Sequence, residues 1–407
     1  MSIRILFISD NFPPEVNAPA TRTYEHCREW VKAGADVTVI TCAPNFPQGV
    51  VYDGFRNKVF QREMMDGIKV FRVWSYISAN EGFLKRTLDY ISFGVSSILA
   101  GLFVKCDVIV ATSPQFFSAL SGRTLGAFRH KPWVMEVRDL WPESIKHVGG
   151  MNDNAVMKYL EWEEKRCYRQ AAGIITVTDS FVRVIREKGI DVGKFAVVKN
   201  GANLELFRPR PKNTDLIESL RSEGKFVVGY IGTHGMAHKL DFIVDCAKKV
   251  KNPNVHFLFI GEGAEKKNVV AHAASLGCTN VTFLDSVSKS SIAEYLSVTD
   301  VALVPLRKSD LFTTVIPSKI FENASMQKPL LLGVDGEARG LVEEYGAGLY
   351  FEPENEVDFL EKLDLLVNDN AIYKGCQEGG ARLAKEFDRN KLALCMLDHL
   401  KRFASKT

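Results

Sequence analysis

The chain has 407 residues, of which 46% are hydrophobic and 25% charged, and its net charge is +3. This length exceeds what one hydrophobic core usually spans, so we expect two domains of roughly 200 residues each. The small charge excess does not indicate nucleic-acid binding by bulk electrostatics. The eight cysteines lack the spacing of a zinc site or a disulfide framework, so we expect reduced thiols, a cytoplasmic location and no bound metal.

Short apolar runs bounded by turn residues recur along the chain, and helical patterns lie between most of them. This alternation predicts parallel sheets built from βαβ units, and therefore an α/β protein with two doubly wound domains. The first run is interpreted as a strand rather than a signal peptide, and no run is long enough to span a bilayer. We expect strands at 3–8, 36–41, 69–74, 107–112, 133–137, 173–178, 195–198, 226–231, 255–260, 281–284, 301–304, 330–334 and 348–351.

Two prolines among polar residues interrupt every regular pattern at 207–213. Because this composition is typical of a linker, we expect a first domain at residues 1–207 and a second at 208–389. The last helical pattern, at 390–407, has an apolar stripe that includes Leu400 and Phe403. We predict that this helix packs back on the first domain.

Two loops of the first domain follow strands and carry polar side chains, and ligands of open parallel sheets bind at such positions. The loop after the first strand contains Glu15, Asn17 and Arg22 but no GxGxxG, which counts against a dinucleotide-binding dehydrogenase. Asn17 can alternatively cap the following helix. After strand 133–137, the carboxylate of Asp139 beside Arg138 can accept a proton from a hydroxyl group, or the two side chains can simply fix the loop.

In the second domain, strand 226–231 leads into a loop with two glycines, two histidines and a lysine. Glycines permit close approach of the backbone, and the imidazoles and Lys239 are placed to meet phosphate oxygens. We therefore take Gly232, Gly235, His238 and Lys239 as candidate contacts to a diphosphate. A tight turn followed by a solvated lysine is the alternative.

Strand 255–260 ends in Gly261-Glu262-Gly263, which begins like a dinucleotide fingerprint but has Lys266 where the third glycine belongs. The segment either approaches a nucleotide base or makes a tight turn before a helix.

A third candidate is the helix that opens at Pro317. A proline at a helix start leaves the next amide donors free, and such starts attract phosphate groups. Ser318 and Lys319 lie at this start, and Glu322, one turn further, can accept hydrogen bonds from two sugar hydroxyls. An ordinary capped helix with solvated charges is the alternative.

Residues 83–105 form a basic, amphipathic pattern with apolar side chains at spacings of three and four. Such a helix can lie in a membrane interface or pack against the first sheet, and its two faces can do both.

Together these segments resemble the retaining glycosyltransferases of family four, which have the GT-B architecture, and within them the WbuB-type transferases of bacterial O-antigen and capsule assembly. The resemblance runs nearly end to end. It rests on Pro13-Pro14-Glu15 with Arg22, on 41–49, on Arg138-Asp139-Leu140-Trp141-Pro142-Glu143, on Asn200-Gly201, on Tyr230-Ile231-Gly232 and on Pro317-Ser318-Lys319-Ile320-Phe321-Glu322.

The resemblance implies two Rossmann-like domains facing an interdomain cleft, with the acceptor bound by the first and a UDP-sugar by the second. By this analogy Glu322 holds the ribose, Ser318, Lys319 and the 235–239 turn meet the diphosphate, and Gly261 to Gly263 approach the base. The acceptor would lie near Glu15, Asn17, Arg22, Arg138 and Asp139, of which the last two are the candidate catalytic residues. No metal or other cofactor is implied.

Three positions depart from the family pattern: Thr314 replaces the first acid of Glu-x7-Glu, Asn17-Ala18 replaces paired glycines, and Arg138 replaces a histidine. The expected activity is transfer of a sugar, such as L-FucNAc or another N-acetylated deoxyhexose, from UDP to a polyprenyl-diphosphate-linked saccharide at the inner face of the cytoplasmic membrane. The alternatives are a nucleotide-sugar epimerase on the same fold and a nucleotide-sugar-binding protein without turnover.

Overall fold

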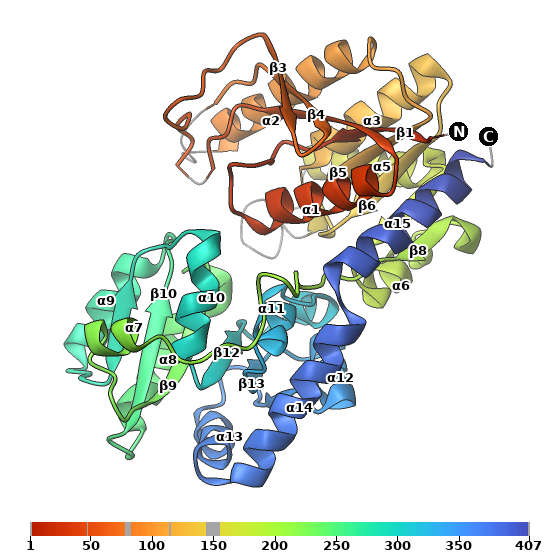
Figure 1. Cartoon of the computed structure of the whole chain (residues 1–407). Coiled ribbons are helices and arrows are strands. Elements are labelled where there is room, and N and C mark those ends of the chain that lie inside the picture. Colours follow the sequence, from red (N-terminus) through yellow and green to blue (C-terminus); the bar gives the residue numbers. More distant parts are fainter. Residues whose placement is uncertain (1, 47, 78–82, 114, 144–154, 406–407) are drawn as a thin grey trace. The chain divides into compact units, whose positions relative to one another are not determined.

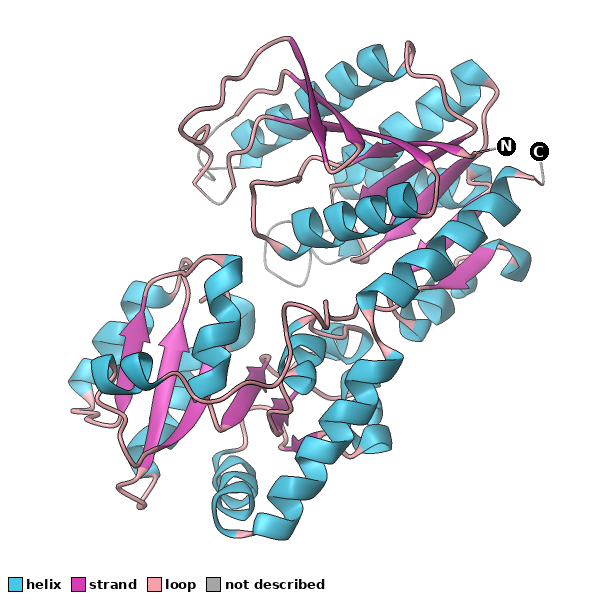
Figure 2. Cartoon of the chain, viewed as in Figure 1, coloured by secondary structure: helices cyan, strands magenta, loops and turns pink. Residues whose placement is uncertain are grey.

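A computed structural model describes residues 2–46, 48–77, 83–113, 115–143 and 155–405. The chain forms two compact units, shown in Figure 1. Unit 1 comprises Met1–Lys199 and Arg389–Thr407, and unit 2 comprises Asn200–Asp388. Each unit is an α/β domain around one sheet, as the alternation of strands and helices predicts (Figure 2).

The sheet of unit 1 has the strand order β3-β4-β2-β1-β5-β6-β7-β8. All neighbouring strands run parallel except β3 and β4, which are antiparallel. The strands are β1 (Arg4–Ile8), β2 (Asp36–Cys42), β3 (Phe60–Met65), β4 (Ile68–Val73), β5 (Val108–Ser113), β6 (Trp133–Val137), β7 (Gly173–Thr176) and β8 (Phe195–Val197).

The antiparallel strand β3 is absent from the strands expected above. It is joined to β4 by Asp66-Gly67, which both have positive φ, of 48° and 80°. Asp-Gly favours this two-residue hairpin turn, because both central residues of the turn must adopt such a conformation. The dipeptide is therefore the signal that the sequence offered for the hairpin.

The helices of unit 1 cover both faces of the sheet. They are α1 (Ala18–Lys32), α2 (Phe83–Gly101), α3 (Phe116–Arg129), α5 (Ala155–Gln170), α6 (Asp179–Glu187) and α15 (Arg389–Ala404), with a short 3-10 turn, η1 (Val192–Lys194). Helix α1 packs against α15, and α3 packs against both α2 and α5. No described helix is long and apolar enough to cross a bilayer.

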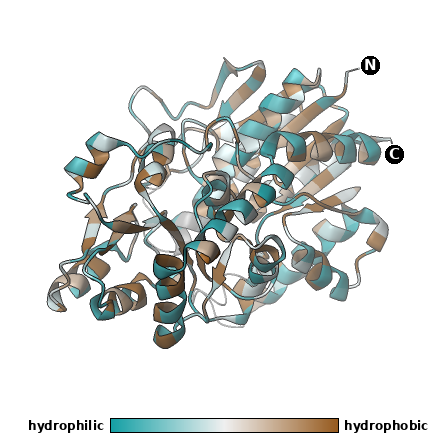
Figure 3. Cartoon of the chain, turned by 60° about the horizontal axis from the view of Figure 1, so that its bottom comes forward, coloured by the Kyte–Doolittle hydropathy of each residue, from teal (hydrophilic) through white to brown (hydrophobic). Residues whose placement is uncertain are grey.

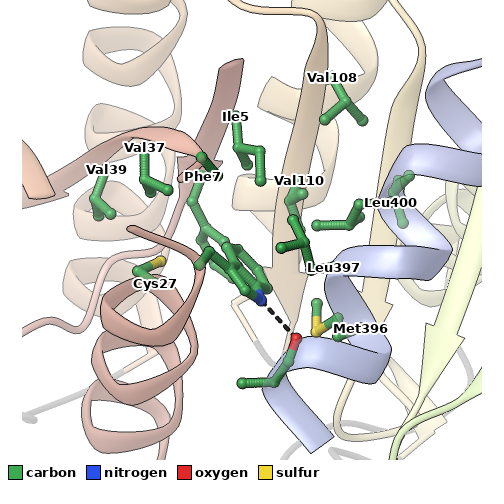
Figure 4. Close-up of a cluster of buried hydrophobic side chains, with 14 of the residues drawn as sticks. Ile5, Phe7, Cys27, Val37, Val39, Val108, Val110, Met396, Leu397 and Leu400 are labelled. Atoms are coloured by element: carbon green, nitrogen blue, oxygen red, sulfur yellow. Dashed lines mark hydrogen bonds between the residues drawn. The ribbon is translucent and has the colours of Figure 1, made fainter. Parts of the chain in front are cut away.

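The core of unit 1 joins the first strands to the last helix, so the prediction that this helix packs on the first domain is confirmed. Figure 4 shows Met396, Leu397 and Leu400 of α15 facing Phe7 and Val110 of the sheet. The indole of Trp30 on α1 donates a hydrogen bond of 2.7 Å to the carbonyl of Ala393 on α15.

Unit 2 has a six-stranded parallel sheet of order β11-β10-β9-β12-β13-β14. Its strands are β9 (Phe226–Ile231), β10 (Val255–Ile260), β11 (Val281–Leu284), β12 (Val301–Pro305), β13 (Leu330–Gly333) and β14 (Gly348–Tyr350). Figure 3 shows strongly hydrophobic colouring along the strands, which matches burial by helices on both faces. The helices are α7 (Thr214–Ser219), α8 (Leu240–Lys249), α9 (Lys266–Ser275), α10 (Lys289–Val298), α11 (Lys319–Ser325), α12 (Glu337–Tyr345), α13 (Glu356–Asn368) and α14 (Asn370–Glu386), with 3-10 turns η2 (Met236–His238) and η3 (Asp310–Thr314).

The boundary between the units lies at Lys199 and Asn200, earlier than the linker composition indicated. The intervening segment belongs to unit 2 because Ala202 forms a β-bridge with Asp388. Phe207 is also buried in a small cluster with Ala293 and Leu296 of α10.

Candidate functional site

The loops after β9 and β10 interlock at the carboxyl end of the unit 2 sheet. The His234 amide donates to the Glu262 carbonyl at 2.8 Å, and the Glu265 amide donates to the His234 carbonyl at 2.9 Å. Gly261 has a φ of 149°, and a Cβ atom on it would lie 1.9 Å from a backbone oxygen of the facing loop. Gly263 has a φ of 158°, and a Cβ atom on it would lie 2.3 Å from another backbone oxygen of that loop. Close packing of the two loops therefore requires glycine at positions 261 and 263. The same packing holds the backbone of His234 in place.

The imidazoles of His234 and His238 are held neutral in this corner of unit 2. Burial lowers the pKa of His234 to about 4, with a smaller effect from Lys266, and lowers that of His238 to about 3, with a smaller effect from Lys319. Both ring nitrogens of His234 and Nδ1 of His238 are buried, and none has a hydrogen-bond partner within the described chain. These rings can therefore donate hydrogen bonds to an incoming group.

Lys319, the first residue of α11, points into the same corner. Its ammonium is buried, lacks a hydrogen-bond partner among the described residues and lies 3.9 Å from the centre of the Tyr230 ring. Burial lowers the pKa of Lys319 to about 7, although Glu322 opposes this effect. A Cβ atom on Gly232 would lie 2.8 Å from Nζ of Lys319, so this glycine leaves room for the ammonium.

Tyr230 connects these groups. Its hydroxyl donates to the Thr233 carbonyl at 2.6 Å, and its ring centre lies 5.7 Å from that of His234 and 5.8 Å from that of His238. We call Tyr230, His234, His238 and Lys319 the Tyr230 cluster. It holds three imidazole nitrogens and one amine that have no hydrogen-bond partner in the part of the chain that the structure describes.

Glu322 lies one turn into α11, as the sequence predicts. Its carboxylate is 3.4 Å from Nζ of Lys289, and both side chains are about four-fifths buried. The first turn begins at Pro317, whose carbonyl accepts from the Ile320 amide at 3.1 Å, and Ser318 precedes Lys319.

Three other candidate residues of unit 2 make contacts within the protein. Lys239 pairs with Asp241 at 2.6 Å, and Glu262 pairs with Lys266 at 2.7 Å. Gly235 precedes the η2 turn. The structure thus brings Gly232, His238 and Lys319 together, whereas the charges of Lys239 and Glu262 are directed to neighbouring side chains.

The acceptor candidates lie in unit 1, and two of them hold the loop after β1. Asn17 caps α1 by accepting from the Ala20 amide at 2.8 Å. Glu15 accepts from the Asn45 and Phe46 amides at 2.7 and 2.9 Å, and burial raises its pKa to about 7.

Arg22 is buried within unit 1. It pairs with Glu136 at 3.0 Å and donates to the carbonyls of Val198 and Lys199, each at 3.0 Å. These contacts connect α1 to β6 and to the segment after β8.

Arg138 and Asp139 follow β6 directly. Nε and Nη1 of Arg138 are buried without a hydrogen-bond partner in the described chain, and burial lowers the pKa of Arg138 to about 10. Asp139 is partly buried, and its carbonyl accepts from the Trp141 amide at 3.1 Å. The indole of Trp141 stacks on Phe116 at 4.7 Å, while Ser144, at the end of this loop, lies outside the described residues.

Two residues of the site, Tyr230 and Lys289, are not among the candidates of the sequence analysis. Tyr230 lies on an apolar strand, where a tyrosine usually indicates core. His234 is one of the two imidazoles that the sequence places near phosphate, and it lies three residues after the end of β9, where ligands of parallel sheets bind. Lys289 has no sequence signal, because only the fold brings α10 beside α11. Groups of histidine, cysteine and acids suited to a metal ion are not found among the described residues.

Two family models match the chain in succession. The glycosyl transferase 4-like domain matches residues 17–201, and glycosyl transferases group 1 matches residues 212–383. WcaI of Escherichia coli K12, which its name assigns to colanic acid biosynthesis as a glycosyl transferase, is 25% identical over 355 residues, 84% of each chain.

A second relative is named N,N'-diacetylbacillosaminyl-diphospho-undecaprenol alpha-1,3-N-acetylgalactosaminyltransferase, from Campylobacter jejuni. It is 24% identical over 250 residues, which are 60% of this chain and 64% of the relative. The fold is similar to HepE of Anabaena, solved with UDP and glucose, with a TM-score of 0.73, 16% identity, and coverage of 98% of this chain and 100% of that one. The chain therefore belongs to the glycosyltransferases of family four with the GT-B fold.

Proposed function

We propose that this glycosyltransferase moves a sugar from a UDP-sugar to a polyprenyl-diphosphate-linked saccharide during assembly of a bacterial O-antigen or capsular polysaccharide. The observation that carries the donor half of the proposal is the Tyr230 cluster. At the carboxyl end of a parallel sheet it places the Lys319 amine, both ring nitrogens of His234 and Nδ1 of His238, none of which has a hydrogen-bond partner among the described residues.

A diphosphate can accept a hydrogen bond from the one N–H group of each neutral imidazole and from the amine of Lys319. Neutral imidazoles donate to phosphate oxygens without the desolvation cost of a buried cation, and Lys319 becomes charged once an anion is beside it. Glu322 then accepts from the ribose hydroxyls and Gly261 to Gly263 face the base. HepE, named with UDP and glucose, supports a UDP-linked donor.

The donor sugar that we propose is an N-acetylated deoxyhexose such as L-FucNAc. Thr314 stands where many family members have an acid, and its hydroxyl donates to the Leu311 carbonyl at 2.8 Å. A neutral residue here suits a sugar with fewer hydroxyl groups to bind.

For the acceptor we propose Glu15, Asn17, Arg22, Arg138 and Asp139. The unpartnered guanidinium nitrogens of Arg138 suit an anionic or hydroxyl-rich ligand. The Campylobacter relative is named for a diphospho-undecaprenol substrate, and this supports a lipid-linked acceptor at the cytoplasmic face of the membrane.

In the proposed reaction, the acceptor hydroxyl oxygen bonds to the anomeric carbon as the bond from that carbon to the diphosphate oxygen breaks. The hydroxyl proton passes to the departing diphosphate oxygen on the same face, so the anomeric configuration is retained. Lys319 and the imidazoles stabilise the charge that grows on the diphosphate, and such fixed donors commonly contribute several kcal/mol.

The test is a mass-spectrometric screen of UDP-sugars with a short polyprenyl-diphosphate-GlcNAc acceptor. We expect one donor to give an acceptor heavier by one glycosyl residue. An altered free sugar formed without acceptor would identify an epimerase, and binding of UDP with neither transfer nor hydrolysis would identify a binding protein. The names of the relatives favour transfer.

A further inference from the structure

The outer face of α2 is apolar and has no covering element in the described chain. Its inner face is buried against α3, where Phe93 and Ser97 lie, and Ser97 bonds Ser121 of α3 at 3.0 Å. On the opposite side, five apolar residues at helical spacing are 41% to 58% exposed: Leu88, Ile91, Val95, Leu99 and Leu102. The predicted stripe therefore divides between the two faces, while the side chains of Phe83, Leu84 and Arg86 lie outside the described residues.

The apolar surface continues beyond the end of α2. Phe103 is 87% exposed, and it lines a surface groove of about 560 Å³ with Leu99, Val59 and Phe60. Arg62 is at the same groove and lies over the rings of Phe60 and Phe71.

The neighbouring helices extend the surface with aromatic residues. Helix α3 lies between α2 and α5 and exposes Phe128, which is 73% accessible. On α5, Tyr159 and Trp162 are exposed neighbours, and the guanidinium of Arg166 lies 4.5 Å from the Trp162 ring. Tyrosine and tryptophan suit a membrane interface because each combines an apolar ring with a polar group.

Lysines accompany these apolar residues. Lys85, Lys105, Lys158 and Lys165 are exposed, and none forms an ion pair within the described residues. An apolar and aromatic surface bordered by unpaired cations is complementary to anionic lipid headgroups. A symmetric dimer through this face would instead bring like charges of the two copies together.

We propose that the exposed side of α2, α3 and α5, with Phe103 and the Phe60 groove, is a docking surface for an anionic bilayer. We call it the α2–α5 face. The inference deepens the proposed function, because a lipid-linked acceptor is held at such a surface.

The experiment is co-sedimentation of the full chain with vesicles of phosphatidylcholine, alone or with an equal part of phosphatidylglycerol. We expect binding to the anionic vesicles that weakens with salt. Ile91→Gln/Val95→Gln/Leu99→Gln should reduce the partition coefficient about tenfold or more, since three exposed apolar contacts are lost. The matched control, Val270→Gln/Val357→Gln, removes exposed valines of unit 2 and should bind as the parent does.

Charge is tested separately. Lys105→Gln/Lys158→Gln should lower anionic binding roughly fivefold for each lysine and leave neutral vesicles unaffected. Lys267→Gln/Lys374→Gln, two exposed lysines of unit 2, should change neither. Absence of vesicle binding, or equal binding by the apolar triple variant, would overturn the proposal. A dimer that the triple variant abolishes would instead identify a second copy as the occupant and would also overturn it.

The assay contains neither donor nor acceptor, so its result is independent of catalysis. UDP binding by calorimetry on the same samples checks that unit 2 is intact. Vesicle binding without glycosyl transfer would refute the proposed function alone, whereas transfer to a detergent-dissolved acceptor without vesicle binding would refute the docking surface alone.

Discussion

Replacement of Lys319 by methionine separates stability from donor binding. Methionine has a similar volume and no charge, so Lys319→Met removes the buried amine while filling its place beside Tyr230. The pKa of Lys319 is lowered from 10.5 to about 7. At 1.36 kcal/mol per pKa unit, this shift corresponds to an upper limit of about 5 kcal/mol for the cost of carrying the folded-state charge.

The sign of the effect follows from the unfolded chain, which holds the lysine proton up to about pH 10.5. Burial of the Lys319 amine therefore lowers the free energy of unfolding by its full amount below pH 7. This destabilisation becomes smaller as the pH rises from 7 towards 10.5. Lys319→Met should raise the free energy of unfolding of unit 2 most at pH 6 and far less at pH 9.5. The assay is urea unfolding at both pH values, following the transition that UDP shifts.

The same substitution should weaken UDP binding. A hydrogen bond to a charged group contributes about 1.5–3 kcal/mol, which corresponds to a loss of roughly 10- to 100-fold in affinity. Parent protein should also take up close to one proton on binding UDP above pH 7, and the variant should not, because burial holds Lys319 neutral until the anion arrives. Calorimetry in two buffers of different ionisation enthalpy measures this uptake.

Lys328→Met is the matched control. Lys328 is a half-buried lysine of unit 2 whose pKa burial lowers to about 8, and its ammonium donates to the Ser297 carbonyl at 3.1 Å. This variant should leave UDP affinity and proton uptake unchanged. A loss of stability at pH 6 in Lys319→Met, or an unaltered affinity for UDP, would refute the assignment of the Tyr230 cluster.

Four further substitutions test the remaining assignments. Glu322→Ala should raise the donor KM strongly with an unchanged circular dichroism spectrum, and an unchanged KM would remove the ribose contact. Asp139→Asn should lower turnover strongly while UDP binding persists, because the Asp139 carboxylate is proposed to orient the acceptor, and near-normal turnover would leave that loop a structural role. The raised pKa of Glu15, about 7 against 4.5, costs stability increasingly as the pH rises from 4.5 to 7. Glu15→Gln should therefore stabilise unit 1 by up to about 3 kcal/mol at pH 8 and by almost nothing at pH 4, as urea unfolding will show. Gly173→Ala places a methyl group 2.4 Å from an aromatic ring of α15 and should cost about 1–3 kcal/mol in thermal unfolding, whereas Gly340→Ala, which meets nothing within 4 Å, should not destabilise.

The sequence pattern was sufficient for the fold because hydrophobic periodicity and turn residues act locally. Parallel strands of unit 2 read as nearly continuous apolar runs, and helices alternate with them, so the doubly wound sheets were predictable. The hairpin of β3 and β4 was missed because β3 is an edge strand with little burial, and its Asp66-Gly67 turn was the one strong signal.

The site was less predictable, because burial and neighbouring partners, rather than residue type, decide which side chains are available to a ligand. Lys239 and Lys319 look alike in the sequence, yet Lys239 pairs with Asp241 while the Lys319 ammonium is buried beside Tyr230. A loop glycine can also serve either to let a ligand approach the backbone or to let two loops pack closely. The sequence does not distinguish these roles, whereas the structure shows that Gly261 packs against the facing loop.

The Tyr230 cluster buries polar groups that have no hydrogen-bond partner among the described residues. This arrangement lowers the stability of the fold relative to a purely apolar core. Buried polar groups are nearly always hydrogen-bonded, so four such nitrogens around one ring are unusual unless a ligand completes them. Burial also keeps both histidines neutral at pH 7, so only Lys319 needs to gain a proton when a diphosphate enters. Under the proposed function, a diphosphate would meet hydrogen-bond donors that are already oriented, and the same donors would meet the charge that forms on the leaving group during transfer.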